Sequence, residues 1–293
     1  LINGLPVRTQ FPNNIIPATR IDKVSAAIQS LIPSPTDLTR LTNNYIPAFP
    51  NDRVTSNESV KIDHQISPKA KISGTWLTNA TATQYSQNLN SSEGLPATIT
   101  QTRGSFSRSM NWRLNFDYTV SPTVLWHVGL GSLQYLLDDH SPTRDFNQVS
   151  AIGLAGTPNP GGRFPTISGL TSATNGGMVP MGPGVGAAQS TTQQFTPTYT
   201  TSVTWVHGNH TSKFGGELRT FGYPFHALTA TNGNFVFSAN QTSQLSNCPT
   251  PTSCAGVQSS TLGVGTMGFP YASFLLGLVT NGVVNPPADN KTG

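Results

Sequence analysis

Residues 110–120 read MNWRLNFDYTV, and apolar and polar side chains alternate strictly along them. An extended strand with this alternation presents one apolar and one polar face. The chain then turns at Ser121-Pro122-Thr123 and resumes the pattern with Val124, Trp126, Val128 and Leu130. The stretch therefore predicts a β-hairpin with one apolar face.

Two further segments show paired strands joined by a short turn. In the first, residues 60–66 alternate and turn at Ser67-Pro68-Lys69 into residues 71–76. In the second, residues 195–205 turn at His207-Gly208-Asn209 into residues 213–219, whose charges lie on one side. The pattern predicts three hairpins, at about 57–80, 106–136 and 192–222.

Long segments of another composition separate these hairpins. Residues 81–105, 138–191 and 223–270 are rich in Ser, Thr, Asn, Gly and Pro. Loops beyond about 15 residues are unusual in a compact soluble domain. Short turns alternating with long loops are typical of outer-membrane barrels, which have short periplasmic turns and long external loops. Strands of roughly 9 to 14 residues can cross a bilayer at a tilt of about 45°.

The composition supports this interpretation. Charged residues make up 10% of the chain, against about 25% in an average soluble domain. The 16 Lys and Arg residues form no basic run, so we expect no nucleic-acid partner. The longest uncharged apolar stretch, residues 269–284, is interrupted by proline and glycine and is shorter than the roughly 20 residues of a spanning helix. We therefore expect no transmembrane helix.

The predicted fold is all-β, an antiparallel transmembrane β-barrel segment with long external loops. Residues 1–56 are expected to be an external loop region with a short helix, and residues 57–293 a partial barrel. The helix is indicated by the spacing of Ile21, Val24, Ile28 and Leu31, with Thr19 as N-cap. A soluble β-sandwich is the alternative, but its turns would recur every 8 to 12 residues or so.

The alternation assigns side chains to two sides of the predicted barrel wall. Side chains expected to face the lumen are charged: Lys61, Asp63, Arg113, Asp117, Lys213, Glu217 and Arg219. Side chains expected to face lipid are apolar or aromatic: Trp112, Leu114, Phe116, Tyr118, Trp126, Val128 and Trp205. Tyr135 and Tyr199 are expected to join an interfacial aromatic girdle. The charged set is expected mainly to solvate and stiffen the wall, with direct substrate contact the minority alternative.

Signatures of catalysis are absent from the sequence. It holds no G-x-S-x-G, G-x-x-x-x-G-K-[ST] or H-E-x-x-H motif, and we expect neither an enzyme nor a cofactor. His207 and His210 flank a turn and are expected to be solvated rather than to bind metal. Cys248 and Cys254 enclose a polar, proline-containing loop, so we expect a disulfide, with two free thiols as the alternative.

Several short stretches resemble the Oar-like subgroup of TonB-dependent outer-membrane receptors. These anchors extend from residue 16 to residue 277: IPATRID at 16–22, IPSP at 32–35, KIDHQIS at 61–67, HTSKFGGELR at 210–219 and ASFLLG at 272–277. The resemblance implies a barrel of about 22 strands, filled by an N-terminal plug and energised through TonB. Its implied partners are outer-membrane lipid, the plug, the TonB system and a large or chelated ligand.

The chain departs from that family pattern in two respects. It contains no recognisable plug, TonB-contacting segment or carboxypeptidase-like leading domain, and its clear strands are too few to close so large a cylinder. It also opens at Leu1 without a signal peptide, as either a processed precursor or an internal fragment would. Because the strands are too few, we expect a fragment from the N-terminal part of a barrel. A passive porin or autotransporter-type barrel and a secreted all-β adhesion or carbohydrate-binding module are the alternative functions.

Overall fold

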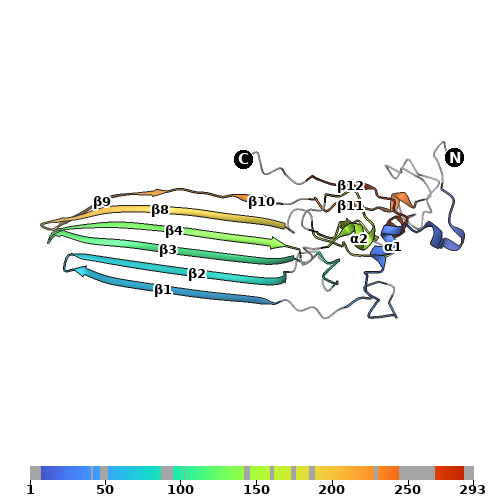
Figure 1. Cartoon of the computed structure of the whole chain (residues 1–293), viewed down its shortest axis with the longest axis horizontal. Helices are drawn as coiled ribbons and strands as arrows, with labels where there is room; N and C mark the ends of the chain where they lie inside the picture. Colours follow the sequence, from blue (N-terminus) through green and yellow to red (C-terminus); the bar gives the residue numbers. More distant parts are fainter. Residues whose placement is uncertain are drawn as a thin grey trace.

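The computed structural model describes residues 8–40, 42–46, 52–86, 95–101, 103–141, 146–158, 162–172, 176–184, 189–227, 230–243 and 268–286. They form a long antiparallel sheet and a smaller lobe at the end of the sheet opposite its tight turns (Figure 1). The lobe comprises the described residues of 8–46, 95–101, 146–184 and 230–286. The expectation of an antiparallel all-β fold is confirmed.

The sheet has seven strands in the order β1-β2-β3-β4-β8-β10, with β9 also pairing with β8. Every pairing within it is antiparallel. Since β9 and β10 pair with different stretches of β8, they share one edge position, and β1 forms the other edge. The sheet is therefore open. The strands are β1 Arg53–Ser67, β2 Ala70–Ser86, β3 Arg103–Ser121, β4 Val124–His140, β8 Gln189–His207, β9 His210–Arg219 and β10 Phe225–Ala227.

Tight turns join the strands at the end of the sheet away from the lobe. Pro68 and Pro122 each begin a two-residue turn, and a register shift precedes each turn. Proline suits the first turn position because its ring fixes φ near the required value. Gly208 occupies that position in the third hairpin with φ 57°, a conformation that costs glycine little. The predicted hairpin turns are thus observed where the sequence placed them.

The register sorts the side chains of the sheet into two faces. Leu114 on β3 is paired with Gly74 on β2 and with Leu130 on β4, which is paired in turn with Tyr199 on β8. We call the side that carries Leu114 the apolar face. The opposite side carries Arg113 and is called the polar face. Because the register is continuous across β1 to β9, each face has the same character on neighbouring strands.

The apolar face has the height of a membrane band. On β3 its apolar run extends from Met110 to Val120, with Arg108 beyond it towards the lobe. At about 3.4 Å per residue this run is roughly 34 Å long. A barrel strand tilted by about 45° would reduce that to roughly 24 Å along the membrane normal, close to the band of about 25 Å in outer-membrane barrels. Leu114 and Trp126 are each 40% exposed, as expected of a face without a protein partner.

The lobe is built from short elements. β5 runs parallel to β11, and β12 antiparallel to it, while β6 and β7 form a separate two-stranded sheet. No helix among the described residues is long and apolar enough to cross a membrane. The elements are β5 Thr166–Ser168, β6 Thr171–Ser172, β7 Gly176–Gly177, β11 Asn234–Val236, β12 Asn281–Val283, α1 Lys23–Gln29, α2 Gln148–Ile152, α3 Pro270–Leu275 and the 3-10 turns η1 Pro12–Asn14, η2 Ala18–Arg20 and η3 Ala239–Gln241.

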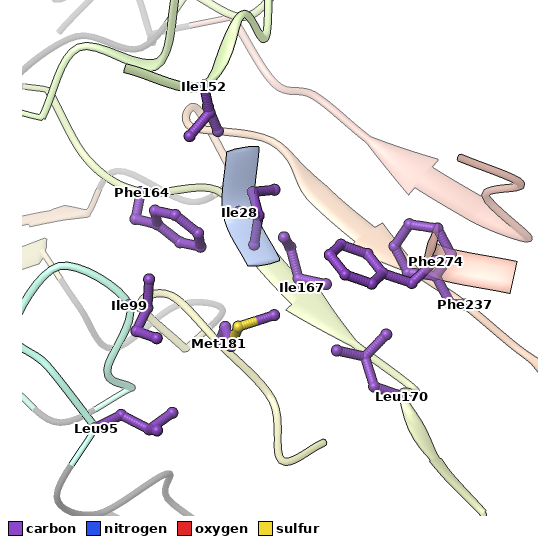
Figure 2. Packing of buried hydrophobic residues seen from close by; sticks show 10 residues of the cluster. All are labelled: Ile28, Leu95, Ile99, Ile152, Phe164, Ile167, Leu170, Met181, Phe237 and Phe274. Carbon is purple, nitrogen blue, oxygen red and sulfur yellow. The ribbon is translucent and has the colours of Figure 1, made fainter. Parts of the chain in front are cut away.

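A hydrophobic core holds the lobe together (Figure 2). Its buried residues come from α1, from the connections between β2 and β3 and between β4 and β8, and from the segments that follow β10. They are Ile28, Leu95, Ile99, Ile152, Phe164, Ile167, Leu170, Met181, Phe237 and Phe274. The connections between barrel strands therefore pack into one folded unit instead of behaving as separate loops.

The short helix of the lobe begins later than the sequence indicated. Asp22, not Thr19, is the N-cap of α1, because its carboxylate accepts a 3.0 Å hydrogen bond from the backbone N–H of Ser25. Thr19 lies in the preceding 3-10 turn. The Ser25 hydroxyl donates to the carbonyl of Phe274 at 2.6 Å. The cap thus begins α1 at the point where it packs against α3.

The strands extend further towards the lobe than the alternation indicated. β2 ends at Ser86 and β4 at His140, whereas β8 already begins at Gln189. Tyr135 was expected in the aromatic girdle, but its partners Ser109 and Gln194 place it on the polar face. Near the lobe, both faces of these strands carry polar residues. The alternation of apolar and polar residues therefore stops before the strands end, and it could not predict these ends.

Candidate functional site: the polar face of the sheet

The polar face carries the charged residues that were expected to face a lumen. Three successive cross-strand rows hold most of them. One row contains Lys71, Asp117 and His127, the next Asp63 and Glu217, and the third Lys61, Arg113 and Arg219. Lys213 lies nearer the turns, paired with Thr204. The register thus brings all seven candidates to one face, and their position in a lumen stays a prediction.

Ion pairs cover both edges of this face. The Asp63 carboxylate lies 3.3 Å from the Lys61 ammonium and 3.1 Å from that of Lys71. On the opposite edge, Arg219 and Glu217 form a pair of 2.9 Å. These side chains are roughly half exposed, and exposed ion pairs contribute about 0 to 1 kcal/mol each. Their main effect is to keep the face polar and hydrated.

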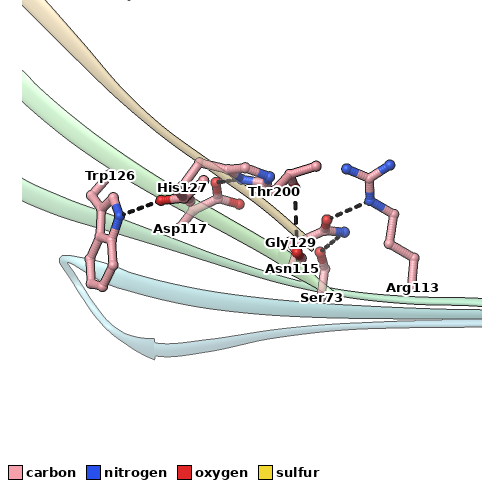
Figure 3. Close-up of polar contacts among 9 residues, drawn as sticks. Ser73, Arg113, Asn115, Asp117, Trp126, His127, Gly129 and Thr200 are labelled. Carbon is pink, nitrogen blue, oxygen red and sulfur yellow. Dashed lines mark hydrogen bonds and ion pairs between the residues drawn. The ribbon is translucent and has the colours of Figure 1, made fainter. Parts of the chain in front are cut away.

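A hydrogen-bonded network occupies the centre of the polar face (Figure 3). Arg113 Nε donates to the side-chain oxygen of Asn115 at 2.8 Å, and the Asn115 amide reaches the Ser73 hydroxyl at 3.4 Å. His127 Nδ1 lies 2.7 Å from Asp117 Oδ1. The Asn115 contact holds Arg113 by its Nε, and one terminal nitrogen of Arg113 lies over Gly129 of β4.

Two glycines of β4 make a hollow in the polar face. Gly129 and Gly131 occupy positions of the polar face at which the neighbouring strands carry side chains, and Gly129 itself is buried. A Cβ at Gly129 would lie 2.4 Å from the Thr200 hydroxyl and 3.3 Å from a terminal nitrogen of Arg113. The hollow has a volume of about 300 Å³, and its lining includes Asn111, Arg113, Gly129, Gly131, Gln194, Thr196, Thr198, Thr200, Glu217, Arg219 and Phe221.

The seven residues expected to meet lipid lie together on the apolar face. Near the turns, Tyr118 is paired with Trp126, and Trp205 lies one row further out. The indole N–H of Trp126 donates a 3.0 Å hydrogen bond to the Thr201 hydroxyl. Nearer the lobe, Trp112 is paired with Trp76. That these residues meet lipid is a prediction from their facing.

Part of the site escaped the sequence analysis. Gly129, Gly131 and His127 were not singled out, although they occupy the polar positions of a strand whose apolar positions were recognised. Continuing the alternation on β4 would have placed all three on the polar face. Phe221 lies beyond Arg219, the last residue of β9, and was not singled out either. Continuing the alternation past Arg219 would have placed it on the polar face.

Two other expectations concern cysteine and histidine. Cys248 and Cys254 lie outside the described residues, so their pairing stays a prediction. His207 and His210 are paired across the β8–β9 turn, and the His207 ring stacks on Trp205 with centroids 5.4 Å apart. Among the described residues, no three His, Cys, Asp or Glu side chains gather as candidate metal ligands.

The sheet thus has an apolar face of membrane height, a polar face with a charged network, tight turns at one end and long connections at the other. These features define the wall of a transmembrane β-barrel. The chain belongs to the outer membrane beta barrel domain family, whose model matches residues 2–292. No curated protein and no solved structure matches it. Family membership places the protein in the bacterial outer membrane.

Proposed function

We propose that this chain is part of the barrel of a TonB-dependent receptor that captures a ligand at the cell surface and takes it up with energy from the inner membrane. The observation that carries the proposal is the open sheet. β1 and the β9–β10 edge each lack a second neighbour among the described residues. The described part of the sheet supplies six strand positions, fewer than the roughly eight with which a barrel interior is just filled by side chains. We take the missing strands to complete a wider cylinder with room for a plug.

The lobe supports a role in capture. It lies at the ends of the strands opposite the tight turns (Figure 1), which is the external side if the turns are periplasmic. Ligand-binding residues are often carried by connections that a rigid scaffold positions. The core of the lobe fixes the β2–β3 and β4–β8 connections relative to each other and to the segments before β1 and after β10. We propose that they act as one surface in ligand capture, and that the barrel has no catalytic role.

The proposal is tested by the conductance of the complete gene product in a planar lipid bilayer. A plugged receptor blocks its own lumen, so we expect low conductance without energised TonB. Crosslinking in cells should in addition link the protein to TonB. A large, steady ion conductance together with no TonB crosslink would contradict the proposal and identify a passive porin.

A further inference from the structure

We propose that the hollow in the polar face binds an oligosaccharide that carries a carboxylate. The inference rests on the proposed function in one respect, since it takes the polar face to line the lumen. Glycine in a strand interior weakens the strand and often marks a close approach by a ligand. Gly129 and Gly131 lie in β4, which has a neighbouring strand on both sides. Without a Cβ at these positions there is room over β4, which Thr200 and Arg113 fill in part above Gly129 and which the hollow beside them leaves open to a ligand.

Arginine supplies the recognition of a carboxylate. Arg113, Gly131, Thr198 and Arg219 follow one another across four strands in a single row. With neighbouring strands about 4.8 Å apart, the two arginines are about 14 Å apart at the backbone, and both side chains line the hollow between them. Glu217 neutralises Arg219 at 2.9 Å. Within the described residues, no carboxylate forms an ion pair with Arg113.

The geometry of Arg113 suits a planar anion. Its Nε is held by Asn115 at 2.8 Å, which orients the guanidinium, and a terminal nitrogen lies over Gly129 (Figure 3). A carboxylate can accept two parallel hydrogen bonds from such a group. Positively charged residues exceed negatively charged ones by one around the hollow, because Arg113 and Arg219 face Glu217 alone. The charge of the hollow therefore complements one carboxylate of a longer acidic sugar chain.

The rest of the hollow suits sugar rings. Asn111, Gln194 and three threonines offer amides and hydroxyls for hydrogen bonds with ligand hydroxyls. Phe221 is 70% exposed beside them, and its ring offers an apolar platform on which the C–H face of a sugar can stack. A volume of about 300 Å³ lies at the lower end of small-molecule sites. It suits a short segment of a longer ligand.

An aromatic stripe leads from the hollow towards the lobe. Gly222 forms a bridge with Phe195, and Phe225 is paired with Thr192, so the register stays constant between them. Alternation then places Phe221, Tyr223 and Phe225 on the polar face, about 7 Å apart along the strand. Tyr223 is 63% and Phe225 61% exposed. A carbohydrate chain entering from the lobe side could stack on these rings in succession until its carboxylate meets Arg113.

Calorimetric titration of the protein in detergent micelles tests the inference with three probes: trigalacturonate, the neutral galactotriose and citrate. We expect trigalacturonate to bind at least about tenfold more tightly than the other two, as one charge-assisted bidentate contact allows. Arg113→Gln should remove this preference. Arg108→Gln makes the same change on the apolar face of β3 and should leave it intact. Phe221→Ala should weaken binding of trigalacturonate, whereas Phe214→Ala, on the apolar face of β9, should not.

Equal affinity for the acidic and neutral sugars would overturn the inference, as would unchanged binding by Arg113→Gln. Binding of citrate as tightly as trigalacturonate would also overturn it, because the hollow would then be a general anion site. Heat-modifiable migration on gels verifies that each variant is folded. The result is separable from the test of the receptor proposal, since an open conductance contradicts the receptor whether or not the hollow binds the acidic sugar.

Discussion

The indole N–H of Trp126 on β4 donates a 3.0 Å hydrogen bond to the hydroxyl of Thr201 on β8. Both side chains lie on the apolar face, and Trp126 lies near the turns (Figure 3). A tryptophan at a membrane interface needs a partner for its one polar group wherever lipid replaces water. Thr201 also donates to the carbonyl of His127 at 3.3 Å. The pair thus connects β4 to β8 beyond the backbone ladder.

Thr201→Val should lower the free energy of unfolding by about 0.5 to 1.5 kcal/mol, because it leaves the Trp126 N–H without its partner. Urea unfolding in lipid vesicles measures this change. Trp126→Phe removes the donor, so Thr201→Val should cost less in that background. Strictly additive effects of the two substitutions would show that the hydrogen bond contributes nothing.

Leu114→Arg should cost about 2 to 4 kcal/mol, because it places a charge near the middle of the apolar band. Asn115→Arg is the matched control, since Asn115 is the next residue of β3 and faces the polar side. It should change stability much less. Refolding into lipid vesicles with urea titration measures both, and equal losses at the two positions would contradict the assigned facing.

The strands and their faces were predictable because their signal is local. A wall with one apolar and one polar face requires alternation in every strand, and residues 110–120 show it without interruption. Pro68, Pro122 and Gly208 supply turn signals of the same short range. Beyond this local signal, predicting the sheet requires only the pairing of neighbouring strands. Short turns determine that pairing in the three hairpins.

The lobe could not be predicted in this way. Its core joins Ile28 of α1 to Phe274 of α3, residues separated by most of the chain. The other segments that contribute to the core have the composition of loops. Neither helical nor strand periodicity marks isolated positions such as Phe164 and Met181. The hollow was missed for a different reason, because only the apolar positions of β4 were followed and the alternation of β9 was not continued past Arg219 to Phe221.

Phe164→Ala should destabilise the lobe by about 3 to 5 kcal/mol, because Phe164 is fully buried and the cavity left behind cannot be hydrated favourably. The sheet should stay intact, since no strand of the sheet contributes a residue to the core cluster. Limited proteolysis of the inserted protein should therefore cleave the lobe and spare the strands. Leu38→Ala is the control, because Leu38 is 86% exposed, and protection equal to that control would argue against a folded lobe.

Alanine substitutions at two glycines distinguish the energy of a left-handed backbone conformation from the energy of a steric clash. Gly153 and Gly169 have φ values of 73° and 74°, so alanine at either is expected to cost about 1 to 2 kcal/mol in backbone energy. At Gly169 a Cβ would lie 2.1 Å from the carbonyl oxygen of Phe237, whereas nothing lies within 4 Å at Gly153. Gly169→Ala should therefore cost clearly more. Hydrogen exchange of β5 and β11 amides measures the difference, and equal effects would refute the close approach of the two segments.

The stability of the lobe is expected to fall at alkaline pH because of Tyr271. Its hydroxyl donates to the side-chain oxygen of Gln29, joining α3 to α1, and burial raises the pKa of Tyr271 to about 12. An unfolded tyrosine has a pKa of about 10. The folded lobe therefore holds the proton more tightly, so the stabilisation is fully present below about pH 10 and is lost as the pH rises towards 12.

Tyr271→Phe should remove this loss of stability between pH 10 and 12, although it also removes the hydrogen bond to Gln29 at every pH. Urea unfolding of the lobe at pH 8 and pH 11, monitored by hydrogen exchange and mass spectrometry, gives the change with pH for each variant. The difference between the two pH values should be smaller in Tyr271→Phe than in the parent protein. Tyr223→Phe, at the exposed sheet edge, should behave like the parent. An identical pH response in Tyr271→Phe and the parent would show that Tyr271 is not protected from ionisation.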